Sequence, residues 1–93
     1  MIIIGGALYV EPSDRAGYLT AAGPVVAAAR SAAGCLDFVQ VADPLADSRI
    51  DVYERWESDA DVDAFRAAGP PLDMPRLRGA DVRKYRVAGV ETP

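Results

Sequence analysis

The stretch between Gly34 and Gly69 constrains the fold more than any other, because it reads as two strands followed by a helix. Apolar and polar residues alternate over 34–41 and again over 50–57, which is the period of a half-buried strand. A serine with an acidic residue three positions later then gives a typical capped helix start. Two prolines directly after Gly69 prevent the helix from extending further. The pattern predicts a β-hairpin that leads into a helix over 58–68.

The flanking segments supply two more strands and a second helix. Residues 2–10 are apolar and begin with β-branched side chains, and residues 81–90 alternate at the strand period. Residues 13–33 are rich in alanine and predict a helix, which Pro24 should kink and Gly34 should end in a left-handed conformation. The order β-α-β-β-α-β predicts a ferredoxin-like α+β fold, in which an antiparallel four-stranded sheet carries both helices on one face.

Length and charge narrow the class of protein. Ninety-three residues suit a single domain over 1–93, and a formal charge of −4 argues against nucleic acid as a partner. No apolar run reaches the ~20 residues that span a bilayer, and no basic region precedes the first apolar stretch, so we expect a cytoplasmic protein without membrane contact. The lone cysteine, Cys35, is interpreted as a buried small hydrophobe in a reduced compartment.

Apolar side chains occur on both faces of the predicted strands. In the second strand, Leu36 and Phe38 share one side, and Val39 and Val41 share the other. Since the two helices cover only one face, a monomer would expose a contiguous apolar surface. The pattern therefore predicts a twofold homodimer in which two sheets pack face to face.

The residues that are missing exclude several kinds of chemistry. The chain has no histidine, which rules out Ser-His-Asp triads and histidine metal sites, and one cysteine cannot form a thiolate zinc cluster. Asp59, Asp61 and Asp63 are interpreted as favourable charges at a helix start, because no glycine and glutamate follow at calcium-loop spacing. We expect no metal site.

The element order, the Gly34-Cys35-Leu36 run and the Glu54-x-Trp56 motif that ends the third strand resemble the antibiotic biosynthesis monooxygenase family. Members of that family are small, cofactor-free oxygenases built as dimeric α+β barrels. The resemblance implies a pocket between the sheet and its helices for a flat aromatic or quinol-like substrate. It also implies that the substrate anion activates oxygen, so that the protein need only bind, orient and deprotonate a phenol and exclude water.

The resemblance assigns roles to particular side chains. Trp56 occupies the tryptophan position of the third strand, and Glu54 shares its face by period two. Glu54 is either a base whose pKa is raised by burial under the helices, or an ion-pair partner in the dimer interface. The catalytic candidates are Trp56, Glu54 and Arg66, and the substrate-binding candidates are Tyr18, Phe38, Val52, Phe65 and Met74, under a cover formed by residues 70–78.

The sequence also departs from the family pattern. Val52 stands where some members carry asparagine, and Phe65 and Arg66 stand where haem-degrading members carry a histidine, so haem degradation is not expected. The favoured function is cofactor-independent oxidation of a small aromatic phenol, quinol or polyketide-like molecule by O2. The alternatives are a non-catalytic dimeric protein that binds a hydrophobic small molecule, and an isomerase or cyclase on the same fold.

Overall fold

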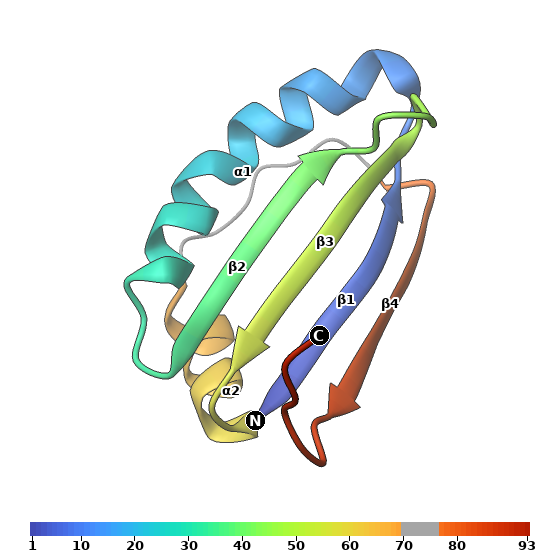
Figure 1. The fold of residues 1–93 in the computed structure, drawn as a ribbon. Coiled ribbons are helices and arrows are strands. Elements are labelled where there is room, and N and C mark those ends of the chain that lie inside the picture. Colours follow the sequence, from blue (N-terminus) through green and yellow to red (C-terminus); the bar gives the residue numbers. More distant parts are fainter. Residues whose placement is uncertain (70–76) are drawn as a thin grey trace.

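The computed structural model describes residues 1–69 and 77–93, and the elements follow the order β-α-β-β-α-β (Figure 1). The strands are β1 (Ile2–Tyr9), β2 (Cys35–Ala42), β3 (Arg49–Trp56) and β4 (Gly79–Arg86). The helices are α1 (Arg15–Arg30), which a short 3₁₀ turn η1 (Pro12–Asp14) precedes, and α2 (Asp59–Ala68). The strands pair antiparallel in the order β2-β3-β1-β4, and both helices lie on one side of the sheet (Figure 1). The predicted ferredoxin-like α+β fold is confirmed.

The core lies between the sheet and the helices and consists of two clusters. The first joins side chains of three strands to Ala29 of α1 and Val62 of α2; its strand members are Ile2, Ile4, Phe38 and Trp56. The second lies under the first half of α1 and contains Val10, Tyr18, Ala22 and Ile50. Because strand side chains alternate, the residues between these positions face the opposite side of the sheet.

A β-bulge at the start of β2 changes which of its side chains face the helices. Cys35 pairs with Trp56 and Asp37 pairs with Arg55, so Leu36 is an extra residue between them. Leu36 is 41% exposed, whereas Phe38 is 4% exposed. The prediction that these two side chains share one face is therefore wrong, because the extra residue resets the alternation and Cys35 packs against the core instead.

The ends of several elements differ from the sequence expectation. Helix α1 runs through Pro24 without restarting and ends at Arg30 with Ser31 as its C-cap. Gly34 is left-handed, with a φ of 78°, but it lies in the connection to β2 and does not cap the helix. Strand β4 ends at Arg86 because its partner β1 begins at Ile2, which pairs with Arg86. The predicted helix start is confirmed, since the N-cap serine of α2 accepts a hydrogen bond from the backbone of the third helical residue.

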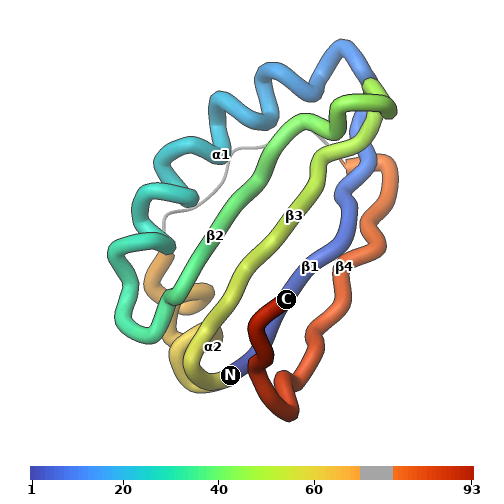
Figure 2. The backbone as a smooth tube through the Cα atoms, viewed as in Figure 1, coloured from blue at the N-terminus to red at the C-terminus, as the bar shows by residue number. Residues whose placement is uncertain are grey.

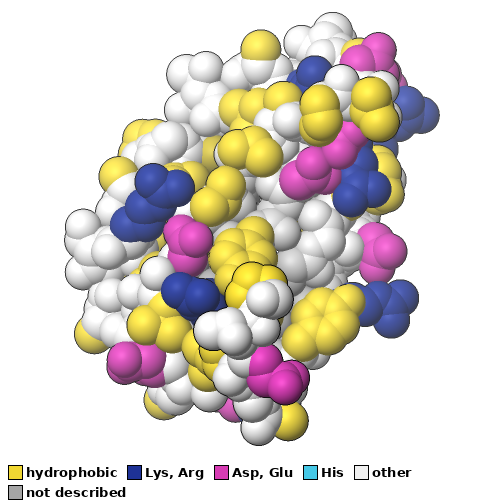
Figure 3. All heavy atoms as spheres, viewed as in Figure 1, with side chains coloured by type: hydrophobic (Ala, Val, Ile, Leu, Met, Phe, Trp, Pro, Cys, Tyr) yellow, Lys and Arg dark blue, Asp and Glu magenta, His cyan; other side chains and the backbone are white. Residues whose placement is uncertain are grey.

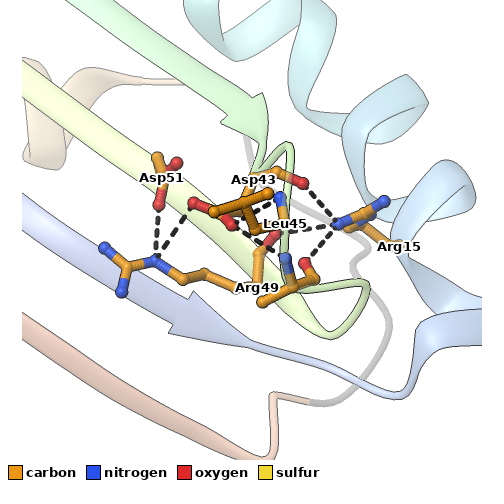
Figure 4. A network of polar contacts seen from close by, with 6 residues as sticks. Arg15, Asp43, Leu45, Arg49 and Asp51 are labelled. Carbon is orange, nitrogen blue, oxygen red and sulfur yellow. Dashed lines mark hydrogen bonds and ion pairs between the residues drawn. The ribbon is translucent and has the colours of Figure 1, made fainter.

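Arg15 connects the start of α1 to the turn between β2 and β3 (Figure 4). Its Nη1 donates to the backbone oxygens of Asp43 at 3.3 Å, Ala46 at 2.8 Å and Arg49 at 3.2 Å. The Asp43 carboxylate accepts from the backbone amides of Leu45 at 3.0 Å and Ala46 at 2.9 Å. The turn of the predicted hairpin is thus held by one guanidinium and one carboxylate, which satisfy backbone groups that strand pairing leaves free.

The sheet face opposite the helices carries a mixture of apolar and charged side chains (Figure 3). Val41 is 49% exposed and Tyr85 is 54% exposed, while Asp51 and Arg55 lie among them by strand alternation. We call this the open sheet face. After β4 the chain turns back, and the Val87 amide donates to the Met1 oxygen, which places the residue that follows β4 beside the N-terminus (Figure 2).

Candidate functional site

Strand β3 presents three of the predicted site residues to the helices. Val52, Glu54 and Trp56 alternate with exposed or half-exposed residues and are 7%, 8% and 0% exposed, respectively. Trp56 packs against both helices through the first core cluster. Glu54 therefore lies on the helix-covered side, and its interpretation as an ion-pair partner in a sheet-to-sheet interface is wrong.

The Glu54 carboxyl forms a hydrogen bond with the tryptophan beside it. The Nε1–H of Trp56 donates to Oε1 of Glu54 at 3.0 Å, and within residues 1–69 and 77–93 no second donor reaches this carboxyl. Burial raises the pKa of Glu54; the hydrogen bond from Trp56 and the positive charge of Arg66 oppose the rise with smaller effects. Glu54 is thus a carboxyl that holds a proton at higher pH than an exposed glutamate does.

Three aromatic rings from three elements surround this pair. Phe65 of α2 lies 5.5 Å from Trp56, with 35° between the ring planes. Phe38 of β2 meets Trp56 edge-on at 6.5 Å and Phe65 at 6.0 Å. These centroid distances are typical of favourable aromatic contacts, and we call the three rings the aromatic cluster.

A cavity of about 310 Å³ lies between the second half of α1 and α2. Its lining is Ala28, Ala32, Ala33, Asp61, Ala64, Phe65, Ala68 and Gly69. This volume is at the lower end of the range for small-molecule pockets. Phe65 contacts both the cavity and Trp56, whereas neither Trp56 nor Glu54 lines the cavity. Phe65 is therefore the one member of the aromatic cluster that lines the cavity, and it separates the cavity from Trp56.

The remaining candidates fall at different places. Tyr18 belongs to the second core cluster and does not join Trp56, and burial raises the pKa of its hydroxyl. Arg66 is exposed and lines a separate cavity of about 210 Å³ between α2 and β4, together with Ile4 and Val62. Met74 and most of the predicted cover over 70–78 lie outside the described residues. The structure thus unites four of the candidates, namely Phe38, Glu54, Trp56 and Phe65.

The model of the antibiotic biosynthesis monooxygenase family matches residues 1–71. The chain belongs to the antibiotic biosynthesis monooxygenase family. The resemblance read from the sequence is confirmed, while no curated protein matches the chain closely enough to assign a substrate.

Several solved structures share the fold of this family member. A Deinococcus radiodurans protein that carries the family's description is 17% identical, with a TM-score of 0.73 over 100% of this chain and 98% of that chain. MhuD of Mycobacterium tuberculosis, a haem degrader solved with two haems in its active site, is 19% identical, with a TM-score of 0.70 over 99% and 100%. PA3566 of Pseudomonas aeruginosa is 20% identical, with a TM-score of 0.70 over 94% of both chains. At these identities the likeness establishes the fold.

Among the residues that line the cavity, only Phe65 was a predicted site residue, and Asp61 was interpreted from the sequence as a helix-start charge alone. Asp61 is half-buried and is the one ionisable side chain that lines the cavity in the described part of the chain. Acidic residues in a first helical turn are common, so the sequence carried no signal of a second role. Among the described residues, no group of three metal-ligating side chains occurs. None of the helices in this part of the chain combines the length and the apolar character that a membrane span requires.

Proposed function

We propose that this family member is a cofactor-independent monooxygenase that oxidises a small aromatic phenol, quinol or polyketide-like substrate with O2. The observation that carries the proposal is the succession of an apolar cavity, the aromatic cluster and a buried carboxyl with a raised pKa. A buried carboxyl with a raised pKa, one aromatic ring away from a cavity, is a candidate for proton-transfer chemistry. Glu54 is the proposed base, and Trp56 holds it in place through their hydrogen bond.

The proposed reaction uses Glu54 as its base and needs no cofactor in addition to the substrate and oxygen. The substrate stacks against Phe65. Rotation of the Phe65 ring then gives the substrate hydroxyl access to Glu54, which accepts the proton. The resulting electron-rich anion reduces O2 directly. For a substrate with a CH2 group conjugated to the phenol, the CH2 becomes a carbonyl, and the two displaced hydrogens leave with the second oxygen atom as water. The protein contributes orientation, proton transfer and exclusion of water.

Oxygen consumption tests this proposal. The protein is assayed with a panel of naphthols, anthrones and quinols, with and without oxygen, and the products are identified by mass. Glu54→Gln should lower kcat at least about 100-fold, which is the usual contribution of a general base. Glu57→Gln removes an exposed carboxylate from the same chain segment and serves as the matched control. Absence of oxygen uptake above background with every substrate would refute the proposal.

A binding protein without catalytic activity is the second candidate. Two observations favour it: Trp56 is completely buried with its N–H already bonded, and Glu54 does not line the cavity. A ligand that binds the folded protein alone raises its melting temperature. Stabilisation by members of the same panel without any oxidised product would select this second function.

Haem degradation, the activity of MhuD, does not fit the residues present. The chain contains no histidine to bind the iron. Phe65, at the position expected for the ligand, instead has its ring against Trp56. The proposed reaction therefore uses no haem.

The proposed assembly is a homodimer of single-domain chains, in the cytoplasm, joined through the open sheet face. Ile3, Val39 and Val41 supply apolar area on this face. Pairing of two copies across this face would remove this apolar area from water, whereas a monomer would leave it exposed.

A further inference from the structure

The cavity between α1 and α2 combines apolar walls with a single charged group. Five of its residues are alanines, one is the ring of Phe65 and one is Gly69, so none of these side chains can hydrogen-bond to a ligand. Asp61 is the exception. Any polar recognition by the described walls must therefore involve this carboxylate or the backbone.

The Asp61 carboxylate is fixed in position by its own helix start. The Ser58 hydroxyl donates to Oδ2 of Asp61 at 2.8 Å, and the Asp61 amide donates back to the same hydroxyl oxygen at 3.2 Å. In the described part of the chain, no donor reaches Oδ1. One oxygen thus orients the group, while the other keeps its capacity to accept a hydrogen bond.

An ionised carboxylate in such surroundings discriminates between ligands by charge. It accepts hydrogen bonds but donates none, so it favours a hydroxyl or N–H group and repels a second anion. The walls beside it are alanine side chains, Gly69 and the Phe65 ring, which offer a ligand no competing side-chain donor or acceptor. No cationic side chain lines the cavity among the described residues, so nothing there offsets the negative charge.

We infer that Asp61 selects the ligand of this cavity: a flat, uncharged aromatic molecule that presents a hydroxyl donor, in preference to an aromatic carboxylate or a plain hydrocarbon. The inference deepens the proposed function and rests on it for the view that the substrate enters this cavity. Asp61 acts here as a specificity-determining residue, and Glu54 keeps its separate role as the proposed base.

Anaerobic binding measurements test this inference without any turnover. Naphthol, naphthoate and naphthalene are titrated into the full-length protein and followed by calorimetry and by the emission of Trp56, the only tryptophan. Hydrogen bonds to charged groups predict that naphthol binds about tenfold or more tightly than the other two. Asp61→Asn should reduce the preference over naphthoate by about tenfold, whereas Asp63→Asn, which removes an exposed charge from the same helix, should leave it unchanged.

A second variant keeps the inference testable if Asp61→Asn weakens the helix start. Ala64→Leu places a larger side chain in the cavity wall and should reduce naphthol binding about tenfold or more, with circular dichroism confirming the fold. Equal affinity for naphthol and naphthoate in the wild type, an equal effect of the two aspartate variants, or full binding by Ala64→Leu would overturn the inference. Binding that depends on Asp61 but gives no oxidised product would refute the proposed monooxygenase function alone. Oxidation without a preference for naphthol would refute the role of Asp61 alone.

Discussion

Replacement of Gly34 by alanine should destabilise the protein for two separable reasons. Gly34 has a φ of 78°, a left-handed conformation that costs a residue with a Cβ about 1–2 kcal/mol. A methyl group there would also overlap the carboxylate and Cβ of Asp61. Displacing that side chain would disturb its hydrogen bonds with Ser58, for which a typical contribution is about 1 kcal/mol. The expected loss is about 2–3 kcal/mol.

Urea unfolding at fixed protein concentration measures this change, with Trp56 emission and far-ultraviolet circular dichroism as the two probes. Gly17→Ala is the matched control, because Gly17 lies inside α1 with nothing within 4 Å of the added methyl group. That control should stabilise the protein by up to about 1 kcal/mol, through the helix propensity of alanine. A Gly34→Ala variant as stable as the wild type would refute both the backbone argument and the placement of Asp61.

Three further predictions concern the core, the carboxyl and the assembly. Trp56→Ala should cost about 3–5 kcal/mol in urea unfolding because the ring is fully buried, and a loss below 1 kcal/mol would mean that the ring is not part of the core. The pKa of Glu54 is raised above its ordinary value of 4.5, so the folded state holds this proton more tightly than the unfolded state does. The resulting contribution to the free energy of unfolding is complete below pH 4.5 and declines as the pH rises through the pKa of the folded state. Glu54→Gln should remove this decline from urea midpoints measured between about pH 4 and pH 8, and an unchanged profile would contradict the assignment. Val39→Asp should change the sedimentation coefficient from that of a dimer to that of a monomer, because it places a charge in the proposed interface. Leu45→Asp, at a turn residue that is 96% exposed, is the control and should leave the dimer intact. A wild-type protein that sediments as a monomer would refute the proposed assembly.

Local signals allowed most of the fold to be predicted. The hairpin, its turn and the capped start of α2 follow from alternation, turn residues and a serine cap, each of which acts within a few residues. The bulge at Leu36 could not be predicted, because an extra residue leaves the composition of the strand unchanged. The end of α1 was placed too late for a similar reason, since alanines continue past Arg30 and favour a longer helix.

The candidate site was predictable only in part, because alternation defines two faces of a strand without saying which one the helices cover. Phe38, Trp56 and Phe65 pack together between the sheet and the helices. The burial of Glu54 shows that this side chain, too, lies on the face that the helices cover. Tyr18 joins a different cluster because its position along α1 places it towards the other end of the sheet. Such separation along an element depends on the packing angle of the helix, which the sequence pattern does not encode.

The contacts of Arg15 have a consequence for how the chain can be engineered. This side chain bridges positions 28 to 34 residues away in the sequence, and its acceptors are main-chain oxygens. Side-chain replacements at the tip of the hairpin, other than at Asp43, therefore leave the acceptors of this bridge in place, whereas an inserted peptide or a new chain break between 43 and 49 would displace the oxygens themselves. Despite its outward position, this tip is a poor place to graft a tag or to open a circular permutant.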